Sequence, residues 1–203
     1  MSAQIIVSGG FDDVKSRDLR FLEEAAKLGE LTVLLWPDAV MKQATGQAPK
    51  FPLAERGYFL KAVRYVSRVE IADAAADFDA LPENLRADVW ADYAPVANAR
   101  REKFAGGKGL AYRVFAAAEL AGFPEPPPMP SAPGRKKVVA TGCYDWVHSG
   151  HVRFCEEASA YGDLYLCLGS DANVRLLKGP GHPLLTEAER RYVAGSIKHV
   201  KQA

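Results

Sequence analysis

Hydrophobic residues recur along the chain in two alternating patterns. Continuous apolar runs predict strands at residues 4–8, 31–36, 69–72, 86–93, 138–141 and 164–169, and helical spacing predicts helices at residues 16–28, 53–66, 109–121, 149–161 and 186–199. Because strands that alternate with helices are typical of parallel sheets with right-handed crossovers, we expect an α/β fold.

The second half of the chain repeats the first. Aligned at a constant offset of 133, residues 8–48 and 141–181 are identical at 15 of 41 positions. One extra residue then moves the offset to 134, which matches Glu55-Arg56 with Glu189-Arg190. A repeat of this length predicts two domain-sized copies of one unit rather than a solenoid.

Six prolines between residues 124 and 133 separate the two copies. Proline locks φ and lacks an N–H, so residues 124–136 are expected to form an extended linker, with a polyproline ligand as the alternative. The predicted domains are residues 1–123 and 137–203. The second is much shorter, so we expect two tandem Rossmann-like, doubly wound parallel-sheet units, the second C-terminally incomplete, in a chain that is a fragment with exposed strand edges.

Composition limits the class of protein. Hydrophobic residues make up 48% and charged residues 25% of the chain, as in ordinary globular proteins. A net charge of +1 argues against a nucleic-acid-binding or membrane-binding surface, and no apolar run approaches a membrane span. The N-terminus predicts no signal peptide, and three widely spaced cysteines predict reduced thiols in a cytoplasmic protein.

The segment 142–151 carries the candidate chemistry. His148 and His151 follow an apolar strand and stand where a helix begins. A helix N-terminus offers unpaired N–H groups and a positive dipole end, glycines allow close approach, and imidazoles add donors, which together predict a triphosphate site. In the first copy, Lys15, Arg17, Asp18 and Thr45 replace His148, Gly150, His151 and Lys178.

The motif Gly142-Cys143-Tyr144-Asp145-x-x-His148-x-Gly150-His151, followed by Lys178-Gly179-Pro180 and Glu189-Arg190, resembles the cytidylyltransferase-like nucleotidyltransferases. This resemblance covers residues 137–203, and residues 4–123 more loosely. It implies transfer of CMP or AMP from CTP or ATP to a phosphorylated alcohol or sugar, with Mg²⁺ on the triphosphate and pyrophosphate as product. It also implies an internal pseudo-dimer or a homodimer. A later Ser/Thr-rich motif with a basic residue, typical of the family, is missing from the sequence.

By the same resemblance, the catalytic residues are His148, His151 and Lys178, with Lys178 on a mobile Gly-Pro-Gly loop. The implied nucleotide-binding residues are Gly142, Cys143, Tyr144, Asp145, Gly150, Asp171 and Arg190. The loop at residues 177–183 is similar to that of the heptose-phosphate adenylyltransferases, whereas residues 142–145 are closer to the lipid-headgroup cytidylyltransferases. The base and the acceptor therefore stay open.

Structural interpretations compete with these roles. Asp145, Asp171 and Arg190 all have counterparts in the first copy, so a turn, a helix cap and an ion pair are the respective alternatives. A zinc site at the two histidines lacks a third ligand at a suitable spacing, and Gly10 at the position of Cys143 argues against a catalytic thiol. The alternatives to an enzyme are a nucleotide-binding or regulatory protein without catalysis and a structural interaction module.

Overall fold

The computed structural model describes residues 2–73 and 77–203. The described chain divides into unit 1, Met1–Lys61 with Tyr65–Ala121, and unit 2, Ala62–Arg64 with Gly122–Ala203. Unit 1 contains β1 (Gln4–Gly9), α1 (Ser16–Ala26), β2 (Glu30–Leu35), α2 (Asp38–Thr45), α3 (Leu53–Lys61), β3 (Arg68–Ile71), β4 (Val89–Tyr93), α4 (Ala99–Gly107) and β5 (Ala111–Phe115). Unit 2 contains β6 (Lys137–Gly142), α5 (Ser149–Ser159), β7 (Asp163–Leu168), α6 (Asp171–Lys178), α7 (Glu187–Gly195) and β8 (Val200–Gln202).

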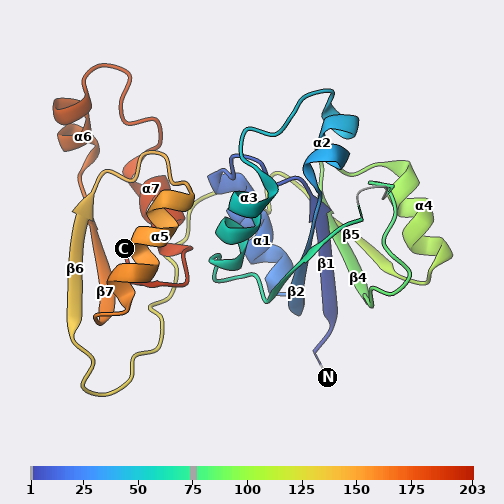
Figure 1. Ribbon diagram of the computed structural model, residues 1–203, viewed down its shortest axis with the longest axis horizontal. Coiled ribbons are helices and arrows are strands. Elements are labelled where there is room, and N and C mark those ends of the chain that lie inside the picture. Colours follow the sequence, from blue (N-terminus) through green and yellow to red (C-terminus); the bar gives the residue numbers. More distant parts are fainter. Residues whose placement is uncertain (1, 74–76) are drawn as a thin grey trace. The chain divides into compact units, whose positions relative to one another are not determined.

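Unit 1 is built on a five-stranded parallel sheet with the strand order β3-β2-β1-β4-β5. Figure 1 shows α1 and α3 on one side of this sheet and α4 on the other. The amphipathic α1 buries Leu19, Leu22 and Ala25 completely. On the α4 side, Ile6, Leu34 and other buried side chains pack with Trp90 and Ala105, so both faces of the sheet are covered.

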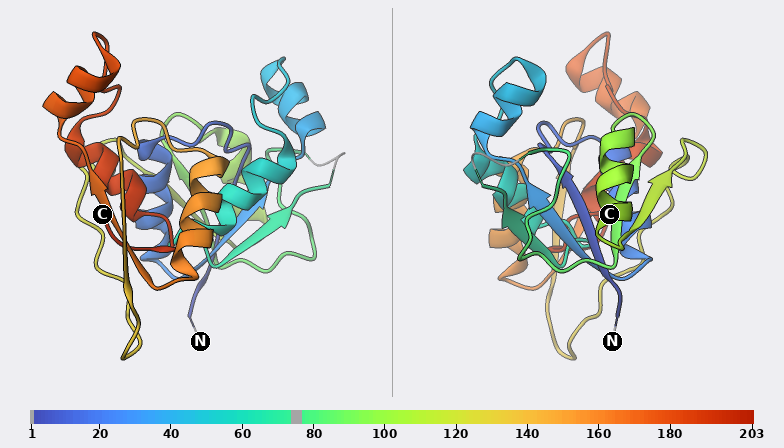
Figure 2. Two further views of the ribbon diagram at one scale, coloured as in Figure 1. Left: turned by 60° about the vertical axis from the view of Figure 1, so that its left-hand side comes forward. Right: turned by 90° about the vertical axis from the view of Figure 1, so that its right-hand side faces the viewer.

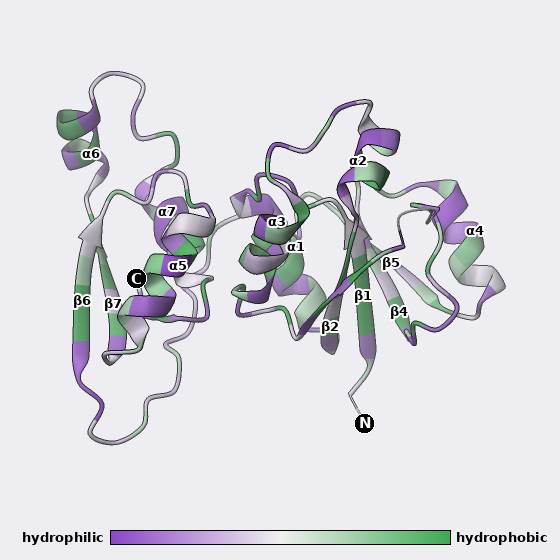
Figure 3. Ribbon diagram, in the orientation of Figure 1, coloured by the Kyte–Doolittle hydropathy of each residue, from purple (hydrophilic) through white to green (hydrophobic). Residues whose placement is uncertain are grey.

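Unit 2 has a three-stranded parallel sheet with the order β6-β7-β8. Its β6 and β7 repeat the register of β1 and β2, and Figure 3 shows the same hydrophobic colouring along β6 as along β1. The exposure differs, however. Val139 of β6 is 62% exposed, whereas Ile6, its counterpart in β1, is 1% exposed beneath the α4 side of unit 1.

The α/β class and the parallel sheets are confirmed. The helix predicted at residues 109–121 is wrong, because residues 111–115 form β5 and pair with β4, while the neighbouring helix, α4, lies earlier in the chain. Alanine and leucine favoured a helix there, but pairing beside β4 overrode that local preference. The short elements α2, α6 and β8 were not predicted either.

The proline-rich segment 124–136 contains no helix or strand. It nevertheless packs on unit 2: the ring of Pro126 lies against Gly195, and the N–H of Met129 donates to the carbonyl of Lys201 at 3.1 Å. The part of this segment around Pro126 and Met129 is therefore packed against unit 2. Within the described residues, none of the helices has the length and apolar character needed to cross a membrane.

Candidate active site

The candidate site lies at the carboxyl end of β6, where the chain turns into α5. Figures 1 and 2 show α6 beyond the same end of β6 and β7, so the β6–α5 turn and α6 share one edge of the sheet. Tyr144 in the turn has a φ of 50°, a left-handed conformation that Phe11 repeats in unit 1 with a φ of 46°. Ligands of open α/β sheets bind at this edge.

His148 is the N-cap residue of α5. Its Nδ1 accepts the backbone N–H of Gly150 at 3.1 Å. An accepting Nδ1 leaves the proton of a neutral imidazole on Nε2, which is then a donor for a ligand. A Cβ at position 150 would lie 2.9 Å from the ring of His148, so Gly150 acts by letting this ring approach the helix.

His151 lies in the first turn of α5, with its ring centroid 4.3 Å from that of His148 and 5.7 Å from that of Tyr144. Its Nδ1 is buried and has no hydrogen-bond partner within the described structure. Burial, then the nearby charges of His148 and Lys178, lower the pKa of His151 below its ordinary value of 6.5. Both imidazoles therefore sit together at one helix N-terminus, and His151 is neutral at pH 7.

Asp145 holds the loop that follows α6. Its side chain is 1% exposed, and Oδ1 accepts the N–H groups of Leu184 and Leu185 at 2.6 and 3.1 Å. Oδ2 lies 2.7 Å from Nδ1 of His182. Burial alone raises the pKa of Asp145, but the His182 and backbone hydrogen bonds outweigh it and hold that pKa below 3.8. The carboxylate is thus a structural anchor of the turn.

Arg190 is fully buried and joins the ends of both strands. Its guanidinium donates to the carbonyls of Cys143 and Gly169, both at 2.8 Å, to the carbonyl of Leu185 at 3.2 Å and to Asp171 Oδ1 at 2.8 Å. These contacts occupy the guanidinium, so the geometry favours the structural interpretation of Arg190 and Asp171. Ser170, rather than Asp171, caps α6.

Unit 1 contains the same two anchors. Arg56 donates to the carbonyls of Phe51, Gly10 and Trp36 and to Asp38, the positions that match the four partners of Arg190. Asp12 accepts the N–H groups of Lys50 and Phe51, as Asp145 does from their counterparts. Because both units share these arginine and aspartate hydrogen bonds, we infer that the two units arose by duplication of one unit.

Unit 1 differs where the histidines would be. Asp18, at the position of His151, accepts the backbone N–H of Lys15 at 2.8 Å, and this capping box closes the N-terminus of α1. Burial raises the pKa of Asp18. A carboxylate of the chain itself therefore lies where unit 2 presents an imidazole.

Lys178 is the last residue of α6. Its predicted position on the Gly-Pro-Gly loop is therefore wrong, because that loop begins at the next residue. Its Nζ lies 4.0 Å from Asp145 Oδ2 and its side chain is 39% exposed. Gly179 and Gly181, with φ of 86° and 88°, turn the chain back toward Asp145. The lysine therefore stands near the histidines, consistent with its effect on the pKa of His151.

The remaining predicted residues form the turn itself. A Cβ at Gly142 would lie 2.8 Å from the ring of Tyr144, so only glycine allows this packing. Burial raises the pKa of Tyr144 to about 12, which keeps its hydroxyl protonated. Cys143, Cys155 and Cys167 are all free thiols. Sequence reasoning missed His182, whose signal was only its place two residues beyond the Gly-Pro pair.

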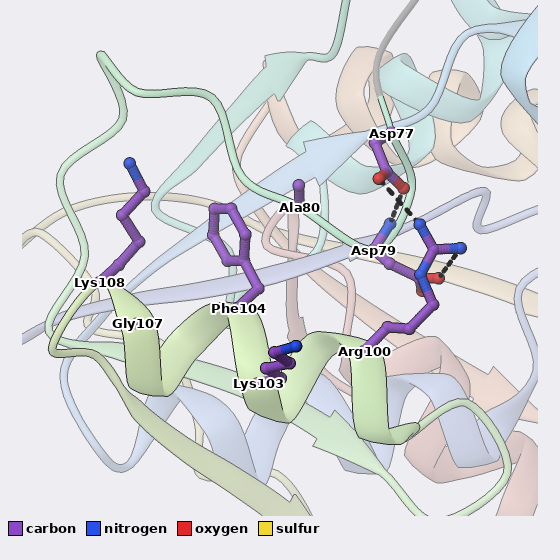
Figure 4. Close-up of a pocket in the computed structure, with 8 residues that line it drawn as sticks. All are labelled: Asp77, Asp79, Ala80, Arg100, Lys103, Phe104, Gly107 and Lys108. Carbon is purple, nitrogen blue, oxygen red and sulfur yellow. Dashed lines mark hydrogen bonds and ion pairs between the residues drawn. The ribbon is translucent and has the colours of Figure 1, made fainter.

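Two cavities lie elsewhere. One of about 480 Å³ in unit 1 lies between α4 and the segment 77–80, where Arg100 pairs with Asp77 and Asp79 at 3.1 and 3.2 Å (Figure 4). Another of about 280 Å³ lies beside Gly162 and Asp163, at the amino end of β7. Neither adds a residue to the candidate site. No three His, Cys, Asp or Glu side chains of the described chain gather as a metal site.

Comparisons with known proteins concern the same part of the chain. Bifunctional protein HldE of Geobacter metallireducens is 48% identical over 67 residues, and that of Azorhizobium caulinodans is 46% identical over 70 residues. These matches cover 32% and 34% of this chain, and 14% and 15% of those proteins. The chain therefore spans only about one seventh of the length of these relatives.

A crystal structure of a lipopolysaccharide core biosynthesis protein from Thermoplasma volcanium has a TM-score of 0.46 and 17% sequence identity, covering 57% of this chain and 96% of that one. The family model described as cytidylyltransferase-like matches residues 139–203, which include the turn, both histidines, Lys178 and Arg190. Residues 139–203 of this chain are therefore similar to the cytidylyltransferase-like family.

Proposed function

We propose that the chain is a nucleotidyltransferase that moves CMP or AMP from CTP or ATP to the phosphate of a phosphorylated alcohol or sugar. The observation that carries the proposal is the pair of imidazoles, 4.3 Å apart at the N-terminus of α5, with Lys178 nearby. The family match of residues 139–203 supports the same class of reaction.

In the proposed reaction, an oxygen of the acceptor phosphate attacks the α-phosphorus of the nucleotide. A new P–O bond forms, the bond between the α-phosphorus and the bridging oxygen breaks, and pyrophosphate leaves with that electron pair. The acceptor phosphate is itself the nucleophile, so the protein needs only to align the two substrates and stabilise charge. This fits a site that offers donors and cations.

Each residue then has a distinct part. Nε2–H of His148 and the ring of His151 would donate to oxygens of the α- and β-phosphates, together with the N–H groups at the start of α5. Lys178 would add a compact positive charge that binds the phosphates of the nucleotide. The backbone at Gly142, Cys143 and Tyr144 would line the nucleotide site, and Asp145, Asp171 and Arg190 would hold this turn in place.

Mg²⁺ would enter as part of the nucleotide substrate. Magnesium usually keeps several waters and takes one or two carboxylates besides phosphate oxygens. Both carboxylate oxygens of Asp145 already accept hydrogen bonds from the protein, and one oxygen of Asp171 accepts from Arg190. The described residues therefore fit a magnesium held mainly by the triphosphate and water, where it supplies charge neutralisation.

The test is pyrophosphate release by the full chain from CTP or ATP, with a panel of phosphorylated alcohols and sugars. His148→Ala and His151→Ala should each lower turnover by about 10²–10³-fold, as for loss of one preorganised donor. Lys15→Ala, the matched change in unit 1, should leave turnover unchanged.

Saturable nucleotide binding without turnover would instead favour the binding or regulatory protein. The proposal is wrong if neither nucleotide is bound or turned over with any acceptor, or if both histidine variants keep full activity.

A further inference from the structure

His182 stands out among the groups around the candidate site because it bonds to the one oxygen of Asp145 to which the backbone of its loop does not donate. All four histidines of the chain, His148, His151, His182 and His199, lie in unit 2. Nδ1 of His182 lies 2.7 Å from Oδ2 of Asp145, and the His182 side chain is 34% exposed. Its Nδ1–H donates to the carboxylate, and Nε2 takes no part in this hydrogen bond.

Unit 1 shows that the turn does not need this histidine. Its Asp12 uses one oxygen for the N–H of Lys50 at 2.6 Å and the other for the N–H of Phe51 at 2.9 Å. In unit 2, the two matching N–H groups both bond to Oδ1 of Asp145. In unit 2 the loop is therefore held by Oδ1 of Asp145 alone, and no backbone N–H of this loop bonds to Oδ2.

Lys178 faces this Oδ2 atom. Its Nζ lies 4.0 Å from Oδ2 of Asp145, at the outer limit of an ion pair, while His182 occupies that oxygen at 2.7 Å. A buried carboxylate oxygen without a donor would attract a lysine strongly, because the Coulomb attraction grows as the surroundings exclude water. The histidine hydrogen bond satisfies that oxygen and leaves the lysine partly exposed.

We propose that His182 is a positioning residue: by occupying Oδ2 of Asp145, it keeps Lys178 from closing onto that carboxylate and available to phosphate. The inference deepens the proposed function and rests on it for the identity of the phosphate ligand. Thr45 stands at the position of Lys178 in unit 1, where no histidine is present. Equivalents of Lys178 and His182 are therefore both missing from unit 1.

The experiment compares His182→Ala, His182→Asn and His182→Gln in the full chain. Asparagine carries an N–H donor near the position of Nδ1, whereas glutamine carries one near Nε2. We expect alanine and glutamine to raise the nucleotide KM by about tenfold with kcat within about twofold, as for loss of binding shared by ground and transition states. Asparagine should restore most of the affinity. His199→Ala, at the opposite end of β7, is the matched control and should leave KM unchanged.

A double-mutant cycle separates positioning from folding. In a Lys178→Ala background, His182→Ala should raise KM less than twofold further, because the lysine that it positions is gone. Thermal unfolding and circular dichroism of each variant check the fold. An unchanged KM in His182→Ala, an equal effect with and without Lys178, or equal rescue by glutamine and asparagine would each overturn the inference.

Binding of inorganic triphosphate, measured by calorimetry on the same variants, keeps the two proposals distinguishable. If the chain shows no turnover but binds triphosphate with the expected His182 pattern, the proposed reaction fails and the inference stands. If turnover is present without that pattern in KM or in triphosphate affinity, the proposed reaction stands and the inference fails.

Discussion

At the scale of single residues, the site separates into groups that build the frame and groups that face outward. Arg190 and Asp145 are almost fully buried. The hydrogen bonds of both side chains go mainly to backbone atoms of the surrounding loops. His148, His182 and Lys178 are partly exposed. The unit-1 counterparts Arg56 and Asp12 repeat only the frame, which is why we assign the frame no direct contact with the reacting atoms.

Replacing Arg190 tests this assignment. Arg190→Ala should lower the free energy of unfolding by at least about 3 kcal/mol, because several buried carbonyls lose their donor at about 1–3 kcal/mol each. Arg56→Ala should have a comparable effect, measured by urea denaturation. If Arg190→Ala instead kept its stability and lost only nucleotide affinity, Arg190 would be a phosphate ligand.

The neutral state of His151 predicts a pH dependence. Its pKa in the folded chain lies below the ordinary 6.5. On acidification, the histidine is therefore protonated at a higher pH in the unfolded chain than in the folded chain. Stability is therefore greatest above pH 6.5 and falls between about pH 7 and pH 5. His151→Gln should flatten this slope without abolishing it, since the pKa of His199 is also lowered by burial. A slope unchanged in the variant would show that His151 does not contribute, and urea denaturation across this pH range measures it.

At the scale of elements, the N-terminus of α5 is the candidate phosphate-binding feature, whereas the N-terminus of the matching helix α1 is capped by a carboxylate of its own first turn. Asp18 caps α1 with a carboxylate from its own first turn, whereas His148 caps α5 with a nitrogen that leaves the rest of the imidazole available. A helix start that is occupied by its own carboxylate has little attraction for a phosphate. The difference between the two units therefore lies in the cap, not in the helix.

Gly150→Ala tests the geometry of this cap. The new Cβ would meet the His148 ring at 2.9 Å, so the ring must move, and turnover should fall by about tenfold to a hundredfold while the helix stays folded. Gly106→Ala in α4 is the control, because its Cβ meets nothing within 4 Å. That change should raise stability by about 0.5 kcal/mol without changing turnover. Equal turnover in wild type and Gly150→Ala would argue against a fixed position of the His148 ring.

At the scale of the whole molecule, the chain carries one frame twice and the candidate chemistry once. Unit 1 covers both faces of its sheet, whereas β6 of unit 2 is an edge strand with Val139 exposed. We therefore expect one nucleotide to bind per chain, in unit 2. Equilibrium titration should give a single site that is lost in a His148→Ala/His151→Ala double variant and kept in Lys15→Ala. Two equivalent sites per chain would contradict this assignment.

The sequence predicted the elements that have long apolar runs or clear helical spacing, including β1, β2, β6, β7, α1 and α5. It missed α6, because eight residues are too few for helical spacing to be recognised reliably, and only Val174 among them is buried. It also missed β8, which consists of three residues and exists through pairing with β7.

For the site, the motif spacing predicted that His148 and His151 lie together, and they do. It left Asp145 and Arg190 ambiguous, because a residue shared by both copies can serve the frame or the ligand, and only their contacts distinguish the two. His182 was missed because its partner, Asp145, lies 37 residues away in sequence.

We propose above all that the two imidazoles at the start of α5 receive the phosphates of a nucleotide. Side-chain ¹⁵N NMR of the four histidines, with CTP or ATP titrated together with Mg²⁺, tests it most directly. We expect the Nε2 resonances of His148 and His151 to shift together and saturably while those of His199 do not move. Saturable nucleotide binding that leaves both resonances unchanged would contradict it.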